Sequence, residues 1–331
     1  MKILLIGLGS IGKRHLNNIL ELGYKNISVV TRSGILPNEY KQLQVFKNLN
    51  DALKDSTYDA AIICTPTALH LDALIPTIQK EIKNIYLEKP ISHSLEKMDE
   101  VFTIAKTHNT RIVIGYDLHF DLGLQKVNEL IQNKELGKVL SVNAQVGQYL
   151  PHWRPHEDYS KGMSAKKETG GGVMLDLIHE FDYLYWLVGK VNKLASFNSN
   201  SKTLNIETED VAEVLLQFEN SVIGTIHLDY LQPELVRNCL FTCSGGTIYW
   251  NLANCSVSWI AVNKEKETFS YIGFERNKRF LEIMKLFLEN DDDERLTSLQ
   301  SGYESLKMVE AAKYSSLNNV VVLLKDFNTT I

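Results

Sequence analysis

The chain has few cysteines, no excess of positive charge and no long apolar run, and each absence narrows the class of protein. Its net charge of −5 gives no reason to expect nucleic acid or an anionic membrane as a partner. No apolar run approaches the roughly 20 residues that a membrane-spanning helix needs. The N-terminus is predicted to be a strand with one lysine rather than a secretory signal, so we expect a cytoplasmic protein.

The four cysteines, at positions 64, 239, 243 and 255, lack the tight spacing of metal ligands. Cys239 and Cys243 alternate with apolar residues in a strand-like run, which favours core thiols over disulfides. No other cluster of metal-ligating residues is evident, so we expect no metal site.

The length of 331 residues suits two domains, with 44% apolar and 23% charged residues as in ordinary globular proteins. Short, wholly apolar runs alternate with helical patterns up to about residue 118, which indicates a parallel sheet covered on both faces. The strands are expected at 2–6, 26–31, 60–64, 84–87 and 111–115, and helices at 68–80 and 94–107, the latter capped by Ser94.

The second half has a different pattern. Helices are expected at 122–133, 173–187, 278–289 and 299–315, and strands at 139–147, 194–200, 211–218, 222–230, 238–243, 247–252 and 257–262. Successive strands separated by turn residues predict a large, mainly antiparallel sheet. The fold class is therefore an α/β Rossmann domain over residues 1–118, followed by an α+β domain over 119–331.

A glycine pattern lies where the first strand turns into a helix. Gly7-Leu8-Gly9-Ser10-Ile11-Gly12 matches G-x-G-x-x-G, with Ile11, His15, Ile19 and Leu22 at helical spacing after it. The first glycine allows the tight turn, the second lets a pyrophosphate approach, and the third lets helix and strand pack closely. The pattern predicts a dinucleotide site, the alternative being a glycine-rich turn with no ligand.

Further candidates follow other strands of the first domain, where open parallel sheets bind ligands. They are Thr65-Pro66, Glu88-Lys89-Pro90 and Tyr116. The residue before a proline is kept out of helical geometry, so Lys89 lies in a stiff turn that could aim its ammonium into a cofactor cleft. The alternative is a lysine extended into solvent.

The residues after the second strand bear on cofactor choice. An acidic side chain about 20 residues past the glycines binds the ribose in NAD-specific sites. Here the positions are Thr31-Arg32-Ser33, without a carboxylate, and the guanidinium of Arg32 suits a 2′-phosphate. We expect NADP, with NAD as the alternative if Arg32 only covers the adenine or if Glu39 reaches the ribose.

Two features of the second domain suit substrate chemistry. Asp176 and His179 are three residues apart after Gly170-Gly171-Gly172, so they would share one helix face as orienting carboxylate and base. The long segment 147–169 is rich in polar aromatics: Tyr149 and Trp153 could stack on a sugar, Arg154 could bond its hydroxyls, and Lys166 could meet a phosphate. The alternatives are a surface charge pair and an ordinary surface loop.

Taken together, these motifs resemble the Gfo/Idh/MocA oxidoreductases, named for glucose-fructose oxidoreductase and inositol dehydrogenase. The resemblance rests on five motifs in the family's order, namely Gly7-x-Gly9-x-x-Gly12-x-x-His15, Thr65-Pro66-x-x-x-His70, Glu88-Lys89-Pro90, Gly170-Gly171-Gly172-x-x-x-Asp176-x-x-His179-x-x-Asp182 and Trp186-x-x-Gly189. Many members space the aspartate and histidine four apart, and a subset has the three seen here.

The resemblance implies a nicotinamide cofactor, a sugar or polyol substrate, and catalysis by Lys89, His179 and Asp176. The motifs and the resemblance together predict cofactor binding by Gly7, Gly9, Ser10, Ile11, Gly12, Thr31, Arg32, Ser33, Thr65, Pro66, His70, Glu88 and Lys89, and substrate binding by Tyr116, Tyr149, Trp153, Arg154, Lys166 and His179. The resemblance also implies a homodimer or homotetramer formed through the C-terminal sheet.

The substrate class stays open at this point. The segment from Gln148 to Lys167 resembles members linked to surface-glycan biosynthesis, which suggests an activated or amino sugar. A dehydrogenase of free polyols such as inositol is one alternative. A sensor that binds dinucleotide and sugar without turnover is another, although such a sensor would not need Lys89, Asp176 and His179 together.

Overall fold

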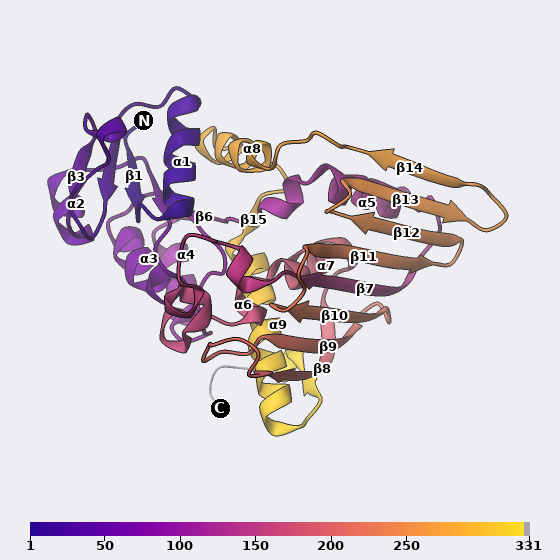
Figure 1. The fold of residues 1–331 in the computed structure, drawn as a ribbon. Coiled ribbons are helices and arrows are strands. Elements are labelled where there is room, and N and C mark those ends of the chain that lie inside the picture. Colours follow the sequence, from indigo (N-terminus) through magenta and orange to yellow (C-terminus); the bar gives the residue numbers. More distant parts are fainter. Residues whose placement is uncertain (328–331) are drawn as a thin grey trace. The chain divides into compact units, whose positions relative to one another are not determined.

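A computed structural model describes residues 1–327 and divides the chain into two compact units, each with its own sheet (Figure 1). The first unit is Met1–Asp117 with Arg276–Gly302, and the second is Leu118–Glu275 with the chain from Tyr303 on. The break at 117/118 adjoins the boundary expected at residue 118. Residues 276–302, which we expected within the second domain, group instead with the first unit.

The sheet of the first unit has seven strands: β1 (Ile3–Ile6), β2 (Ile27–Val30), β3 (Gln44–Phe46), β4 (Ala60–Ile63), β5 (Asn84–Leu87), β6 (Arg111–Ile114) and β15 (Thr297–Ser298). The order is β3-β2-β1-β4-β5-β6-β15, and every pair is parallel except β15 with β6. The strand order reverses between β1 and β4, as in dinucleotide-binding sheets. The predicted parallel Rossmann sheet is confirmed.

The helices of the first unit are α1 (Ser10–Glu21), α2 (Leu49–Asp55), α3 (His70–Gln79), α4 (Met98–Thr107) and α8 (Arg276–Leu288). Helix α8 packs on α1, where the guanidinium of Arg14 lies 4.8 Å from the ring centroid of Phe280. The prediction that a helix starts at Ser94 was wrong. Lys97 has a left-handed φ of +64°, so the helix begins only at Met98.

The sheet of the second unit has nine strands: β7 (Val139–Gly147), β8 (Val191–Ser199), β9 (Val211–Phe218), β10 (Ile223–Asp229), β11 (Val236–Cys243), β12 (Gly246–Asn251), β13 (Ser256–Ala261), β14 (Lys266–Ser270) and β16 (Val322–Leu323). The order is β14-β13-β12-β11-β7-β10-β9-β8-β16. Among the strands of residues 1–327, only β7 and β10 of this sheet pair in parallel, so the predicted mainly antiparallel sheet is confirmed.

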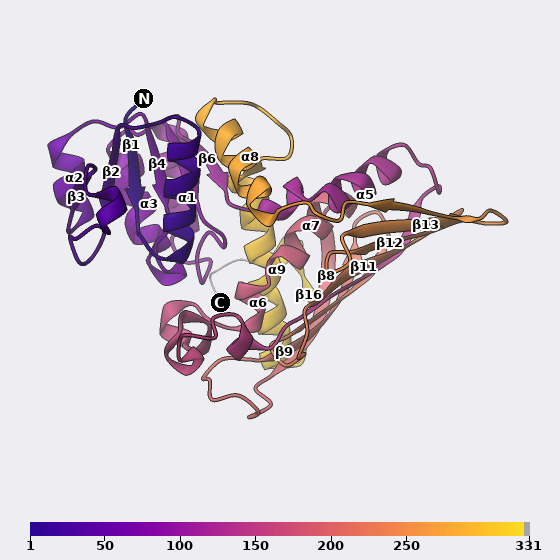
Figure 2. The ribbon, with the colours of Figure 1, turned by 45° about the horizontal axis from the view of Figure 1, so that its top comes forward.

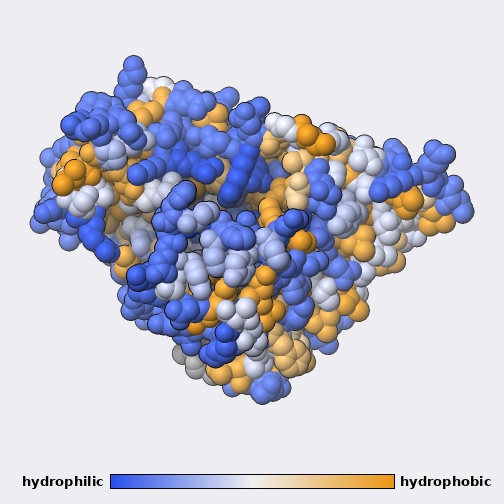
Figure 3. All heavy atoms as spheres, in the orientation of Figure 1, coloured by the Kyte–Doolittle hydropathy of each residue, from blue (hydrophilic) through white to orange (hydrophobic). Residues whose placement is uncertain are grey.

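The helices of the second unit are α5 (Leu122–Gln132), α6 (Val173–Asp176), α7 (His179–Val188) and α9 (Leu299–Asn318), whose first turn belongs to the first unit. Figure 2 shows this sheet nearly edge-on, with α5 and α7 on one face. On β7 the inward residues Val142, Ala144 and Val146 are buried, while Asn143 is exposed on the opposite face. Figure 3 shows that opposite face, where hydrophobic and hydrophilic residues are interspersed.

The single helix predicted over 173–187 is two helices in the structure. Leu177, with φ −101° and ψ +31°, ends α6, and α7 begins at His179. Asp176 and His179 therefore flank an irregular turn rather than lying on one continuous helix face.

The four cysteines are free thiols, and Cys64, Cys239 and Cys243 are buried, as the sequence pattern predicted. Burial in apolar surroundings raises the pKa of the Cys64 thiol well above its usual value. Within residues 1–327, no helix is both long enough and apolar enough to cross a membrane.

Candidate active site

The three glycines at the start of α1 form a cradle, and glycine suits each position for a different steric reason. Gly7 has φ +97°, and a Cβ there would lie 2.6 Å from the carbonyl oxygen of Cys64. A Cβ at Gly12 would overlap the carbonyl oxygen of Gly7, so this position holds the helix close to the strand. A Cβ at Gly9 would meet nothing within 4 Å, which leaves an open approach to the helix N-terminus. The cradle thus fits a dinucleotide pyrophosphate.

The predicted residues at the carboxyl ends of the strands all lie on one side of the point where the strand order reverses, the side of β4, β5 and β6. Thr65 follows β4, Lys89 follows β5 and Tyr116 follows β6. The hydroxyl of Thr65 is buried and has no hydrogen-bond partner among the described residues, so it offers a polar contact at this edge. Tyr116 is fully buried, and its expected contact with substrate stays a prediction.

The side chain of Glu88 is fixed inside the first unit rather than presented to solvent. Its Oε1 accepts a hydrogen bond from Nε2 of His15, a buried residue of α1, at 2.6 Å. Its Oε2 accepts from the backbone N–H of Lys89 at 3.3 Å. The carboxylate therefore ties helix α1 to the turn that carries Lys89, whose side chain is half-buried.

His70 is also enclosed, at 1% exposure. Its Nδ1 lies 2.7 Å from the carbonyl oxygen of Pro90, and its Nε2 lies 3.0 Å from that of Thr65. Burial lowers the pKa of His70, so the neutral ring predominates and donates one of these bonds. The described contacts of His70 and Glu88 are with protein, and direct cofactor binding by either stays a prediction.

In the second unit, the glycines before α6 make room for a carboxyl group. Gly172 has φ +117°, and a Cβ there would collide with the side chain of Glu209. Glu209 Oε1 accepts from the N–H of Met174 at 3.4 Å, which satisfies a free donor at the start of α6. Burial raises the pKa of Glu209, and the charge of nearby Asp176 raises it further.

Asp176 has a partner that the sequence did not reveal. The buried hydroxyl of Tyr230, just after β10, donates to Oδ2 of Asp176 at 2.6 Å. Burial and that carboxylate raise the pKa of Tyr230 well above its usual value, so it stays a donor. No local pattern indicated this contact, because the two residues are 54 positions apart.

His179 and Asp182 differ in their surroundings although the resemblance groups them in one motif. His179 begins α7 with 7% of its surface exposed. Asp182 lies deeper, with Oδ2 at 2.9 Å from Nε2 of His119, whose ring stacks on Trp186 at 4.3 Å between centroids. Asp182 therefore holds His119 inside the second unit, which is a structural role, whereas His179 lies at the first position of α7.

The aromatic segment 147–169 is ordered as short 3₁₀ turns rather than as one loop: Leu150–His152, Tyr159–Lys161, Met163–Ala165 and Lys167–Thr169. The ring of Trp153 packs edge-on against Tyr230, with 5.4 Å between centroids, so it lies next to the partner of Asp176. Tyr149 contacts His152 within the segment. Arg154 and Lys166 form exposed pairs with Glu157 and Glu168.

A second cation accompanies Arg32 at the end of the first unit's outer strands. Arg32 is exposed after β2, and Lys47 follows the neighbouring strand β3. The N–H of Thr31 donates to the carbonyl of Phe46 at 3.0 Å, and the aliphatic chain of Lys47 packs so closely on Gly34 that a Cβ there would clash. Lys47 thus lies beside the Arg32 turn, where sequence analysis named no residue.

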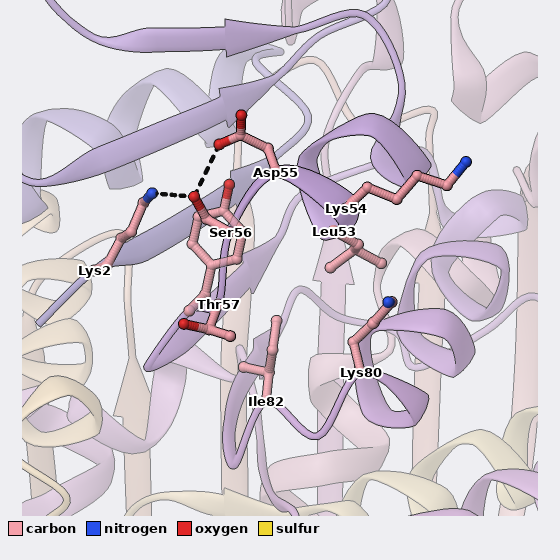
Figure 4. Close-up of a pocket in the computed structure, with 9 residues that line it drawn as sticks. Lys2, Leu53, Lys54, Asp55, Ser56, Thr57, Lys80 and Ile82 are labelled. Atoms are coloured by element: carbon pink, nitrogen blue, oxygen red, sulfur yellow. Dashed lines mark hydrogen bonds between the residues drawn. The ribbon is translucent and has the colours of Figure 1, made fainter.

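A cavity of about 610 Å³ opens elsewhere on the first unit (Figure 4). Lys2, Lys54 and Lys80 line it, and the Lys2 ammonium donates to the hydroxyl of Ser56 at 2.6 Å. Lys2 precedes β1 and Ser56 precedes β4, so the cavity lies at the amino ends of the strands. It is separate from the edge that carries Lys89. Within residues 1–327, no group of three or more His, Cys, Asp or Glu side chains could hold a metal ion.

Comparison with family models defines the class of protein. The model described as "Oxidoreductase family, NAD-binding Rossmann fold" matches residues 1–116, and that described as "GFO/IDH/MocA C-terminal domain" matches residues 124–249. The chain therefore belongs to the Gfo/Idh/MocA family of NAD-binding oxidoreductases, and the predicted resemblance is confirmed.

Individual relatives are distant. The chain is 27% identical over 232 residues to "Uncharacterized oxidoreductase YrbE" of Bacillus subtilis, covering 67% of this chain and 65% of that protein. It is 24% identical over 347 residues to "Myo-inositol 2-dehydrogenase" of Thermotoga maritima, covering 97% and 100%. The T. maritima match thus spans the full relative, whereas the B. subtilis match spans slightly less than two-thirds of its relative.

Solved structures show the same fold. The WlbA dehydrogenase of Bordetella pertussis, in complex with NADH and UDP-GlcNAcA, superposes with a TM-score of 0.81 at 20% identity, covering 98% of both chains. An inositol dehydrogenase homolog of Azotobacter vinelandii, in complex with NAD⁺, gives a TM-score of 0.84 at 14% identity, covering 98% of this chain and 97% of the other.

Proposed function

We propose that this protein transfers a hydride between a nicotinamide cofactor and a secondary alcohol or ketone of a sugar. The observation that carries the proposal is the fixed turn of Lys89, at the carboxyl end of β5 next to β4, in a chain of an NAD-binding oxidoreductase family. The resemblance assigns the catalytic roles to Lys89, His179 and Asp176.

The chain's residues divide the proton chemistry between them. The nicotinamide supplies the hydride acceptor or donor when it is bound. During oxidation, His179 takes the hydroxyl proton, and Lys89 stabilises the negative charge that develops on the oxygen. Asp176, held by Tyr230, orients and balances the charge of the imidazole. During reduction, His179 returns the proton to the same oxygen.

For the substrate we favour an activated or amino sugar of surface-glycan biosynthesis. The half-buried ring of Trp153, which packs on Tyr230, offers an apolar face of the kind that sugars stack on. The B. pertussis structure named above, which holds UDP-GlcNAcA, supplies one test compound. A free polyol is the second candidate, because the relative that matches this chain over its full length is named a myo-inositol 2-dehydrogenase.

For the cofactor we favour NADP over NAD. Arg32 and Lys47 supply two cations at neighbouring strand ends, where a 2′-phosphate would lie. Glu39, the carboxylate that could compete for the ribose, is exposed on the helical turn Asn38–Tyr40, and its charge contributes to the raised pKa of Tyr40.

We further assign cofactor binding to the first unit, and substrate binding and assembly to the second. The face of the second sheet that α5 and α7 do not cover carries Phe197, Leu215 and Ile223, which are exposed at 74%, 52% and 52%. Adjacent strands β8, β9 and β10 contribute these residues. Such a face suits self-association, as a homodimer or a homotetramer.

The experiment is an absorbance assay at the nicotinamide band with NADPH or NADP⁺. The substrates are myo-inositol, levoglucosan, D-xylose, UDP-GlcNAcA and related amino sugars, which the names of relatives and fold neighbours suggest. On the compound that is turned over, Lys89→Ala and His179→Ala should each lower kcat by about a hundredfold or more while NADPH still binds. Near-native turnover by both variants would refute the assignment.

A further inference from the structure

Two buried histidines enclose the turn that carries Lys89 from opposite ends. His15, in α1, bonds the side chain of Glu88 at the first position of the turn. His70, at the start of α3, bonds the carbonyl oxygen of Pro90 at the third position. Lys89 lies between these two anchored residues.

The hydrogen bond between His15 and Glu88, the first anchor of the turn, lies in closely packed surroundings. A Cβ at Gly115, which follows β6, would lie 2.6 Å from the hydroxyl of Tyr86 and 3.1 Å from Oε1 of Glu88. Glycine therefore leaves space for the carboxylate. The ring of His15 packs edge-on against Tyr86, with 5.0 Å between centroids, and against Phe280, with 6.0 Å. Packing on both sides limits the ring to the orientation that bonds Glu88.

His70, whose bond to Pro90 is the second anchor of the turn, also contacts the segment that follows another strand. His70 also contacts the carbonyl oxygen of Thr65, so its ring joins the segment after β4 to the segment after β5. These segments flank the carboxyl edge at which a nicotinamide is expected. Because the ring is 1% exposed, it acts on Lys89 only through the backbone of the turn.

We propose that His15 and His70 are positioning residues for Lys89, and that His15 couples cofactor binding to the geometry of the catalytic turn. Helix α1 begins at Ser10, next to Gly9, and carries His15 near its middle. Its N-terminus is the predicted pyrophosphate site, so a phosphate that orders this helix also orders Glu88 and the backbone of Lys89. The inference rests on the proposed function, since it concerns how Lys89 is held for that reaction.

Hydrogen–deuterium exchange of the whole protein, with and without NADPH, tests the coupling without relying on turnover. In the wild type, NADPH should slow exchange in the peptide that contains residues 88–91. In His15→Leu, which lacks the donor, this protection should be lost, whereas His15→Gln, which keeps an N–H donor, should restore it. His93→Leu is the matched control, because His93 is exposed three residues beyond Pro90.

Kinetics on the active compound give the second measurement. His15→Leu and His70→Leu should lower kcat by about tenfold to a hundredfold while KM changes less than threefold, because the lysine is misplaced rather than absent. If His15→Leu does not fold, Gly115→Ala crowds the same carboxylate and should also remove the protection of the turn.

The outcomes separate the inference from the function on which it rests. Unchanged protection and kcat in His15→Leu and Gly115→Ala, together with inactive Lys89→Ala, would overturn the positioning role and leave the proposed function intact. Full activity of Lys89→Ala would instead overturn the proposed function.

Discussion

The hydroxyl of Tyr230 donates a 2.6 Å hydrogen bond to Oδ2 of Asp176, which joins the end of strand β10 to the last residue of helix α6. The hydroxyl is buried, and its raised pKa keeps it protonated. Asp176 is therefore held by the sheet as well as by its own short helix, and its role beside His179 stays a prediction.

This bond predicts the effect of removing one oxygen atom. Tyr230→Phe should lower kcat/KM by about tenfold, because a hydrogen bond to a charged group contributes roughly 1.5–3 kcal/mol. The measurement is steady-state turnover on the active compound, with NADPH affinity measured in parallel. Tyr249→Phe serves as control, since Tyr249 is an exposed residue of β12. Equal kinetics in Tyr230→Phe and wild type would argue against a role for Asp176.

The cations after β2 and β3 predict cofactor choice. The wild type should bind NADPH more tightly than NADH, and Arg32→Ala and Lys47→Ala should each weaken NADPH binding by about tenfold, through loss of a charge-assisted contact to phosphate. NADH binding should change little. Titration of nicotinamide fluorescence measures the six affinities of the wild type and the two variants for NADPH and NADH, with Lys41→Ala, at another exposed lysine, as control. Tighter NADH binding by the wild type would overturn the preference.

The glycine cradle predicts two different outcomes for two similar substitutions. Gly12→Ala should destabilise the fold by about 1–3 kcal/mol, because its Cβ would overlap the Gly7 carbonyl. Gly9→Ala should leave thermal stability unchanged, since no atom lies within 4 Å, yet weaken NADPH binding by about tenfold or more, because the Cβ blocks the approaching pyrophosphate. Thermal unfolding and NADPH titration of both variants check this. Unimpaired NADPH binding by Gly9→Ala would place the phosphates elsewhere.

His227 predicts a stability change with pH. Its two ring nitrogens lie 2.8 Å from Asp229 and 2.5 Å from Glu213, and these contacts raise the pKa of His227 to about 9. The folded state thus binds a proton more tightly than the unfolded state. The stabilisation is complete below pH about 6.5 and is lost as pH rises through about 9. A shift of this size would contribute about 3 kcal/mol to the free energy of unfolding if the ring were shielded from solvent. Because the ring is half-exposed, we expect a contribution of about 1 kcal/mol.

Urea unfolding of wild type and His227→Gln at pH 6 and pH 9.5 measures this effect. From pH 6 to pH 9.5, the free energy of unfolding of the wild type should fall by about 1 kcal/mol more than that of the variant. His93→Gln, at an exposed histidine, is the control. The same pH dependence in wild type and His227→Gln would show that the two carboxylates do not stabilise the charged ring.

The sequence by itself determined the features that depend on neighbours along the chain. The glycines at 7, 9 and 12, the apolar strands β1, β2, β4, β5 and β6, and the turn at Lys89 are local patterns, because backbone sterics and side-chain periodicity act over a few residues. The short strand β3 begins with an exposed glutamine, lacks a wholly apolar run, and was not predicted. The Rossmann sheet and the mainly antiparallel second sheet could therefore be predicted. Helix starts were less certain, as Lys97 shows, because one left-handed residue is enough to delay a helix.

Only the tertiary structure decided which side chains meet across the sheets. His15 and Glu88 are 73 positions apart, and Tyr230 and Asp176 are 54 apart. Helix α8 and strand β15 join the first unit after the chain has passed through the second sheet. Lys47 lies beside Arg32 because β2 and β3 pair in parallel. Such contacts are set by strand order and by packing around the buried core, and neither is encoded in the spacing of residues along the chain.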